Sequence, residues 1–249
     1  MAGALNTFAR LAPTEAQPQL AAVARDLAED ETLSRGTAHL ALCVALRGST
    51  EELRLPASNM WLTPGAAHDA QHAAYMADPE GAPFNAAFIS FPSAKDPTWP
   101  ERHPGTSTCH IIADAGGWER WQAWADERVK HRGAEYAELK GRLSARLLHL
   151  LYREFPQLRG RVVFSELGTP LSSAFYIGAA HGESYGLAGT PARFRLTWLQ
   201  PRSPLAGLYL VGVDILSPGF VGALVSGALT AITICPRVAW DNLRAVVRL

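Results

Sequence analysis

The residues best suited to bind a cofactor occur near the end of the sequence. The apolar run Leu205–Leu210 leads to Asp214, a pattern that predicts a strand ending at that carboxylate. A turn at Ser217–Gly219 follows, and an uncharged run from Gly219 to Cys235 predicts a helix. A carboxylate just past the end of a strand lies where open α/β sheets bind ligands, and it can accept hydrogen bonds from sugar or ribityl hydroxyls. The free amides of the helix N-terminus favour anionic or electron-rich groups.

Small side chains line the predicted helix and would let another backbone or a flat ligand approach closely. They are Gly219, Gly222, Ala223, Ser226 and Gly227. This pattern indicates a nucleotide-cofactor site. Tight packing of a helix on a sheet, with Asp214 as a capping residue, is an equally good explanation of the pattern taken alone.

Other reactive side chains give weaker indications. His68 and His72 have the spacing of a zinc pair on one helical face, but no third ligand is evident, so a polar helix face is the favoured interpretation. Cys109 and His110 are neighbours on a predicted strand and would point to opposite faces. No G-x-S-x-G motif occurs, so the sequence gives no support to hydrolase chemistry.

A run between Thr169 and Leu187 combines loop residues with titratable and aromatic ones, among them Tyr176, His181 and Tyr185. Loops of this composition often line pockets, and we expect the same here. The physical chemistry of the run does not identify its ligand.

Composition narrows the classes of protein. The chain has 249 residues, a formal net charge of +0 and 48% hydrophobic residues. The charge balance argues against a nucleic-acid-binding protein, and the apolar content argues against a disordered one. Three widely spaced cysteines (Cys43, Cys109, Cys235) indicate a reducing compartment, so we expect a cytoplasmic location.

Two segments bear on targeting. Residues 1–12 lack a basic segment followed by a long apolar core, so we expect no secretory signal. Gly219–Cys235 is at the short end of the range for a membrane span, and Pro218 and Pro236 enclose it. A buried helix is therefore the favoured interpretation, with a membrane anchor as the alternative.

Alternating strands and helices predict an α/β fold with α+β character. A capping box at Thr14 and Gln17 predicts the first helix. Strands are expected at His39–Leu46, Ala86–Phe91, Thr108–Ala113 and Arg161–Glu166. Helices are expected at Ala66–Met76, around Trp118–Ala125, and after Gly133 along the stripe Tyr136, Leu139, Leu143, Leu147, Leu150 and Leu151. Residues 167–205 are expected to be ordered loop.

Three blocks of sequence resemble the FAD-dependent carotenoid and retinoid oxidoreductases, a family that includes phytoene desaturases, carotenoid isomerases and retinol saturases. The first is FISFPSAKDPTWPERHPG at Phe88–Gly105, and the second lies within Lys130–Leu187. The third, PLAGLYLVGVDILSPGFVGALVSGALTA at Pro204–Ala231, is similar to the closing flavin-contact motif of the family. The three blocks occur in the family's order and cover most of the chain from Ala38 to Ala231.

The resemblance implies a fold and a set of cofactor-binding residues. The fold would be a mixed sheet with helices, forming a substrate domain that covers an apolar tunnel, plus the terminal strand and helix of a glutathione-reductase-type FAD domain. Asp214 would bind the ribityl chain of FAD, and Gly212 would let the backbone pass the cofactor. The helix start would lie at the flavin ring, where its dipole stabilises negative charge on the reduced ring. The residues of that start are Gly219, Phe220, Val221, Gly222 and Ala223.

The same resemblance sets the expected division of the chain. Residues 1–37 would be a helical lead-in, 38–203 the substrate-domain portion, 204–235 the FAD-contact strand and helix, and 236–249 a tail. No G-x-G-x-x-G occurs, so a separate N-terminal FAD-domain chain is an expected partner. The implied substrate is a polyene or another apolar lipid, which makes peripheral membrane contact reasonable. The alternatives are a non-catalytic remnant or apolar-ligand binding module, a subunit of a split flavoenzyme, and a membrane-anchored accessory protein.

Overall fold

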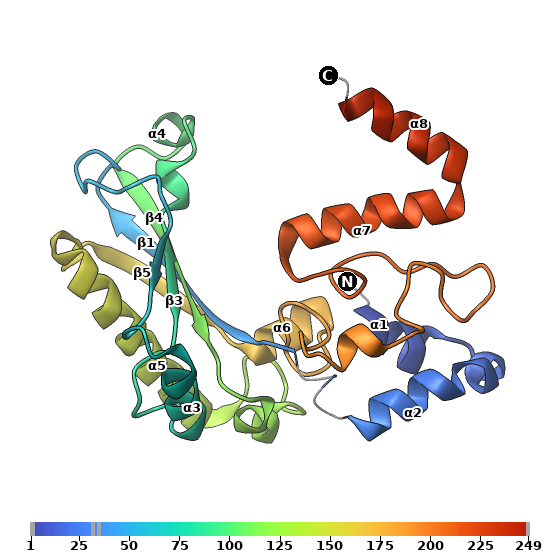
Figure 1. Cartoon of the computed structure of the whole chain (residues 1–249). Helices are drawn as coiled ribbons and strands as arrows, with labels where there is room; N and C mark the ends of the chain where they lie inside the picture. The colour runs from blue at the N-terminus through green and yellow to red at the C-terminus, as the bar shows by residue number, and fades with distance from the viewer. Residues whose placement is uncertain (1–2, 31–32, 34–35, 248–249) are drawn as a thin grey trace. The chain divides into compact units, whose positions relative to one another are not determined.

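The computed structural model describes residues 3–30, 33 and 36–247 (Figure 1). The chain forms two compact units. Unit 2 is continuous and comprises Ala38–Phe175, whereas unit 1 combines Met1–Thr37 with Tyr176–Leu249. The boundary after residue 37 is as expected, whereas the second boundary lies after Phe175 and not after residue 203. The segments before and after unit 2 in the sequence belong to the same unit.

Unit 2 is built on a five-stranded sheet in the order β2-β3-β4-β1-β5. The strands are β1 (His39–Arg47), β2 (Met60–Leu62), β3 (Ala87–Ser90), β4 (Thr106–Asp114) and β5 (Val162–Gly168). The strands expected at four places in the sequence are confirmed to within a few residues at each end. The three-residue strand β2 is an addition, since it is too short to give a periodic signal.

The expectation of a mixed sheet is wrong, because each pair of neighbouring strands is antiparallel. The long helix α5 (Gly133–Glu154) connects β4 to β5, and these two strands point in the same direction. They would make a parallel pair if they were adjacent. Strand β1 lies between them and runs the opposite way, as in a split β-α-β unit.

Alternation along the strands explains why α5 covers one face of the sheet. On β1 every second side chain is buried, and Leu40, Leu42 and Leu46 are fully so. Figure 1 shows α5 along one side of the sheet. Its buried side chains are Tyr136, Leu139, Leu143, Leu147 and Leu151, which confirms five positions of the predicted stripe; Leu150 is half-buried against the same core. Each fully buried leucine contributes roughly 1.5–3 kcal/mol.

The helix expected at Trp118–Ala125 is replaced by two short 3-10 turns, Trp118–Arg120 and Gln122–Trp124. A 3-10 helix has three residues per turn, so the spacing of three between Trp118, Trp121 and Trp124 matches it better than an α-helix. Trp121 is fully buried, and its indole N–H donates to the Ala115 carbonyl at 3.1 Å. Burial of this one large side chain thus fixes the segment.

The remaining helices of unit 2 are short. They are α3 (His68–Ala77) and α4 (Trp99–Arg102), with 3-10 turns at Pro92–Ala94 and Pro156–Leu158. Helix α6 (Pro170–Ile177) runs across the boundary between the units and corrects the expectation of an irregular segment over 167–205. Pro170 is well suited to the first helical position, since its missing N–H is not needed there.

Unit 1 contains mostly helices and turns. Its elements are α1 (Gly3–Asn6), a π turn (Thr7–Leu11), 3-10 turns (Thr14–Leu20 and Arg193–Arg195), α2 (Ala21–Glu29), α7 (Gly219–Ile234) and α8 (Pro236–Val247). Residues 236–249, expected as a tail, therefore contain a helix, which turns away from α7 at Pro236 (Figure 1). The buried side chains Phe8, Leu20, Val23 and Trp198 belong to its core.

Two sequence expectations for unit 1 are wrong. The capping box at Thr14 does not form, because Pro18 prevents regular helix there and α2 begins only at Ala21. The strand expected to end at Asp214 is absent, and only an isolated bridge joins Arg202 to Tyr209. Two backbone hydrogen bonds, Leu210 N–H to the Pro201 carbonyl and Ser203 N–H to the Leu208 carbonyl, flank this bridge, and side chains of α7 bind the Leu210 carbonyl and the Gly212 N–H.

The helix expected from Gly219 is confirmed as α7. Within the ranges that the structure describes, no helix combines the length and apolar character that crossing a membrane requires.

The packing of α5 on the sheet predicts a large effect of one truncation. Leu147 is fully buried in the core of unit 2, so Leu147→Ala should lower the free energy of unfolding by about 2–5 kcal/mol. Chemical denaturation measures this loss. Glu138→Ala, at an exposed position of the same helix, is the matched control and should change it by less than about 0.5 kcal/mol. Equal effects of the two substitutions would contradict the packing described for α5.

Candidate functional site

The first turn of α7 is built around two glycines. Gly219 has φ +90°, a backbone conformation that side chains with a Cβ rarely adopt. A Cβ at Gly222 would lie 2.0 Å from the carbonyl oxygen of Ser217. The small residue is therefore required where the turn before the helix folds back against its first turn. The small side chain was expected to let another backbone approach the helix closely, and the backbone that does so at Gly222 is that of the preceding turn.

Two hydroxyls of α7 bind the backbone of the segment before Asp214. Ser226 Oγ accepts a hydrogen bond from the Gly212 N–H at 2.8 Å and donates to the Ala223 carbonyl at 2.7 Å. Thr230 Oγ1 lies 2.8 Å from the Leu210 carbonyl oxygen, to which it donates. Both hydroxyls are buried. They hold the segment before Asp214 against the helix, and they do so from positions four residues apart, which face the same way.

Asp214 joins three segments of unit 1. Its Oδ2 accepts the N–H of Ala4 at 2.8 Å, and its Oδ1 accepts the N–H of Leu187 at 2.8 Å. A Cβ at Gly186 would lie 2.0 Å from Oδ1, and Gly186 also has φ +73°, so only glycine suits that position. Each carboxylate oxygen accepts about two hydrogen bonds, so Asp214 keeps acceptor capacity for a ligand.

A cavity of about 450 Å³ adjoins this carboxylate. Of the predicted cofactor-binding residues, Gly212 and Asp214 line it, whereas Gly219, Phe220, Val221, Gly222 and Ala223 do not. Gly212 has φ +118°, and no atom lies within 4 Å of the position that its Cβ would occupy. The other lining residues come from α1 and the first residue of the π turn (Thr7), from Ile177–Gly186 and from Tyr209–Ile215, all within unit 1.

Two buried charged residues near this cavity were not found from the sequence. Glu183 lines it and accepts the N–H of His181 at 2.8 Å; burial raises the pKa of its carboxyl, and backbone hydrogen bonds oppose that rise. Arg193 is 2% exposed and donates to the carbonyls of Leu187 (2.8 Å) and Val213. Burial lowers the pKa of its guanidinium, and the charge of Asp214 acts in the opposite direction. No periodicity or motif marks either residue, so only the folded contacts reveal them.

The first turn of α7 also presents an unusual apolar surface. Phe220 is 80% exposed and Val221 is 67% exposed. Pro218 precedes the helix, and no side chain caps its first amides. An uncapped helix start with exposed apolar side chains suits a flat, electron-rich ring.

These features fit the ribityl and ring portions of a flavin. Asp214 has free acceptor capacity, Gly212 leaves space, and α7 offers uncapped amides beside Phe220. The ADP portion has no counterpart in the sequence, since no G-x-G-x-x-G occurs in it.

The other sequence candidates lie elsewhere. Parts of Thr169–Leu187 line the cavity as expected, but Tyr176, His181 and Tyr185 are not among its lining residues. His72 Nδ1 lies 2.8 Å from Asn85 Nδ2, and the described residues contain no group of three metal-binding side chains.

The cysteine and histidine of β4 do point to opposite faces. Cys109 is buried, which raises the pKa of its thiol to about 12. His110 instead faces Cys43 across the β1–β4 pair, and burial lowers the pKa of its imidazole.

Comparison with known proteins supports the resemblance to the retinoid oxidoreductases. No family model matches the chain. It is 34% identical over 235 residues to the all-trans-retinol 13,14-reductase of Danio rerio, an alignment that covers 92% of this chain and 38% of that protein. It is 32% identical over 251 residues to the human all-trans-retinol 13,14-reductase, an alignment that covers 98% of this chain and 40% of that protein. An inactive all-trans-retinol 13,14-reductase of Danio rerio is 30% identical, with 95% and 39% covered.

The chain thus spans less than half the length of the curated relatives that it matches. The predicted resemblance to the carotenoid and retinoid oxidoreductases is confirmed, and the relatives found are retinol reductases.

The contacts of Asp214 predict that Asp214→Asn breaks one of its two hydrogen bonds to the backbone. Only one atom of the amide side chain can accept a hydrogen bond, so either Ala4 or Leu187 loses its partner. The free energy of unfolding should fall by about 1–3 kcal/mol, and hydrogen exchange at one of the two amides should accelerate. Asp241→Asn, at an exposed position of α8, is the control and should leave both readings unchanged.

The raised pKa of Glu183 predicts a pH dependence of stability. Folding raises this pKa above its ordinary value of 4.5, so the folded chain holds the proton more tightly. The stabilisation is therefore complete at low pH and is lost as the pH rises from 4.5 through the raised pKa. Glu183→Gln removes this titration, so its Tm should fall less than that of the parent between pH 4.5 and neutrality. Parallel Tm profiles would refute the assignment.

Proposed function

Because this chain is a relative of the all-trans-retinol 13,14-reductases, we propose that it is part of a flavin-dependent oxidoreductase that saturates a double bond of a retinoid or related polyene. The observation that carries the proposal is the similarity, at 32–34% identity, along 92–98% of the chain. The sequence blocks at Phe88–Gly105 and Pro204–Ala231 support the same assignment.

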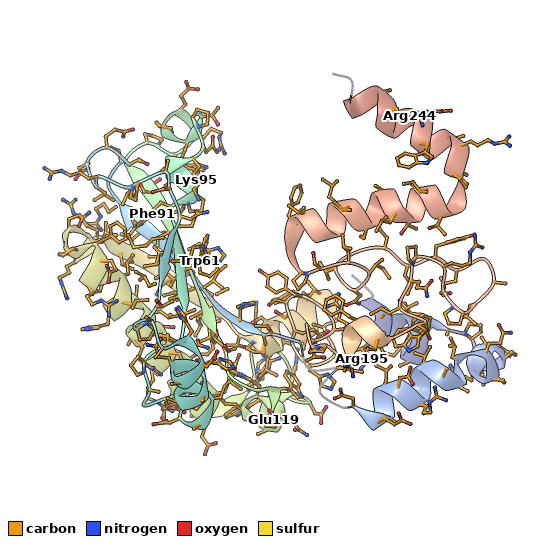
Figure 2. All side chains as sticks on the ribbon, in the orientation of Figure 1. Trp61, Phe91, Lys95, Glu119, Arg195 and Arg244 are labelled. Carbon is orange, nitrogen blue, oxygen red and sulfur yellow. The ribbon has the colours of Figure 1, made fainter. Side chains whose placement is uncertain are left out.

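Unit 2 would be the substrate-domain portion. The sheet face opposite α5 carries Trp61, which is 72% exposed, and its ring centroid lies 5.0 Å from that of Phe88. Phe88 pairs in register with Ile112, so an apolar row crosses three strands (Trp61 is labelled in Figure 2). Such a row suits the flat, apolar chain of a polyene.

Unit 1 would hold part of FAD, as the terminal segment of a glutathione-reductase-type FAD domain. In this proposal Asp214 accepts a ribityl hydroxyl, Gly212 lets the backbone pass the cofactor, and the amides at the start of α7 stabilise negative charge. Phe220 and Val221 would lie beside the ring, with Gly219, Gly222 and Ala223 keeping the turn compact. When bound, the flavin supplies the reducing electrons, which no side chain can provide.

A second component completes this arrangement. The ADP half of FAD needs a strand, a glycine-rich turn and a helix, which a further FAD-domain segment or chain would contribute. The expected setting is the cytoplasm, with peripheral contact to the membrane in which an apolar substrate dissolves.

A second candidate function is the binding of an apolar ligand without reaction. The observation in its favour is the similarity to a relative named as inactive, at 30% identity over 95% of the chain. The two candidates differ in one outcome: a binding module retains retinol unchanged, whereas an enzyme converts it.

The test is reconstitution. The chain is expressed alone and together with the portion of the zebrafish reductase that it does not match, with FAD and a reductant supplied. We expect flavin absorption bands to survive desalting only in the combined preparation. That preparation should convert all-trans-retinol to a product that absorbs at shorter wavelength, because saturation shortens the conjugated system. Retention of flavin and retinol without conversion would favour the binding module, and absence of both would reject the proposal.

A surface variant tests the flavin contact without disturbing the fold. Phe220 is 80% exposed, so Phe220→Ala should leave the Tm unchanged and yet weaken flavin retention in the combined preparation by about tenfold. Leu224→Ala is the matched control, since Leu224 is 62% exposed one turn further along α7. Equal loss of flavin in both variants would argue against a specific contact at Phe220.

A further inference from the structure

A second cavity, of about 240 Å³, lies within unit 2 and is separate from the proposed flavin site. It is formed by the end of β2, the loop before β3 and one face of α5. Its lining residues are Leu62, Thr63, Pro64, Pro83, Phe84, Ala87, Arg146, His149, Leu150 and Arg153. Most of them are apolar, so the cavity can hold a hydrocarbon group.

The polar side of the cavity is basic. Arg146, His149 and Arg153 have the spacing i, i+3 and i+7, which places them on the same face of α5. None of the lining residues is acidic. A negatively charged group is therefore the ligand that this side of the cavity complements.

Arg146 is a fixed cation. It donates to the carbonyl oxygens of Pro79 at 2.7 Å and Ala82 at 2.5 Å, and its guanidinium carbon lies 4.5 Å from the centre of the Phe84 ring. These partners are uncharged, and the ion pairs found among the described residues do not include Arg146. Its positive charge is held in place and stays uncompensated.

The charge count selects the class of anion. Arg153 pairs with Glu154 at 2.7 Å, which leaves one net positive charge from Arg146 beside the cavity. A single charge matches a carboxylate better than the dianion of a phosphate monoester. The volume accommodates about eight groups of the size of a water molecule.

We propose that this cavity binds an apolar monocarboxylate, with its hydrocarbon part against Leu62, Phe84 and Leu150 and its carboxylate facing Arg146 and Arg153. The site is independent of flavin and of the proposed reaction. It follows from the cavity, its apolar walls and the two arginines.

The test is calorimetric titration of the full chain with octanoate, which has eight carbons and one negative charge. We expect saturable binding in the millimolar range or tighter, weakened by added salt. 1-Octanol, which lacks the charge, and acetate, which lacks the hydrocarbon chain, should each bind at least tenfold more weakly. Binding of 1-octanol as tight as that of octanoate, or no saturable binding of octanoate, would overturn the proposal.

Two substitutions at the cavity should act in opposite directions. Arg153→Gln removes one cation and should weaken octanoate binding about threefold to tenfold, whereas Glu154→Gln removes the competing carboxylate and should strengthen it about threefold. Arg25→Gln in unit 1 is the matched control, because Arg25 is similarly exposed and also pairs with the next residue, Asp26. Circular dichroism confirms folding of each variant. An Arg153→Gln chain that is folded and binds octanoate like the parent would also overturn the proposal.

Discussion

The arrangement of unit 1 depends on one buried carboxylate. Asp214 accepts the N–H of Ala4 and the N–H of Leu187, and these residues belong to three stretches far apart in the sequence. Buried N–H groups need acceptors, and a carboxylate can serve both at once. Arg193 strengthens the same junction through the carbonyls of Leu187 and Val213. The cavity beside Asp214 exists because this junction holds its walls together, so the carboxylate has a structural task as well as its proposed role toward a ribityl hydroxyl.

The sequence predicts well those elements whose own pattern decides their structure. The alternation in β1 and the leucine stripe of α5 each bury one face, and the structure has both where they were expected. The helix from Gly219 was likewise evident from its composition and its flanking prolines. Burial of apolar side chains is the dominant favourable term in folding, so a periodic apolar pattern carries most of the needed information.

The predictions fail where a distant partner decides the outcome. The run Leu205–Leu210 has the composition of a strand, yet its backbone makes two hydrogen bonds to Pro201 and Ser203 and one to the Thr230 hydroxyl in place of a regular ladder. The burial of Arg193 and Glu183 is likewise not predictable from the sequence, because their hydrogen-bond partners are backbone atoms, which no side-chain pattern reveals. Of the predicted cofactor-binding residues, Gly212 and Asp214 line the cavity. No pattern in the sequence predicts that the N–H of Ala4 donates to the same carboxylate.

The interrupted order of unit 1 has a consequence for synthesis on the ribosome. Its first 37 residues emerge before unit 2, and their main partners emerge after it. Phe8, Leu20 and Val23 therefore remain without the Trp198 side of their core until the segment that carries Trp198 has been made. Unit 2 is continuous and can complete its sheet first, although β1 must itself wait for β4 and then β5. The nascent chain thus carries an exposed apolar segment for as long as unit 2 and the segment with Trp198 are being made, and a chaperone could bind that segment in this period.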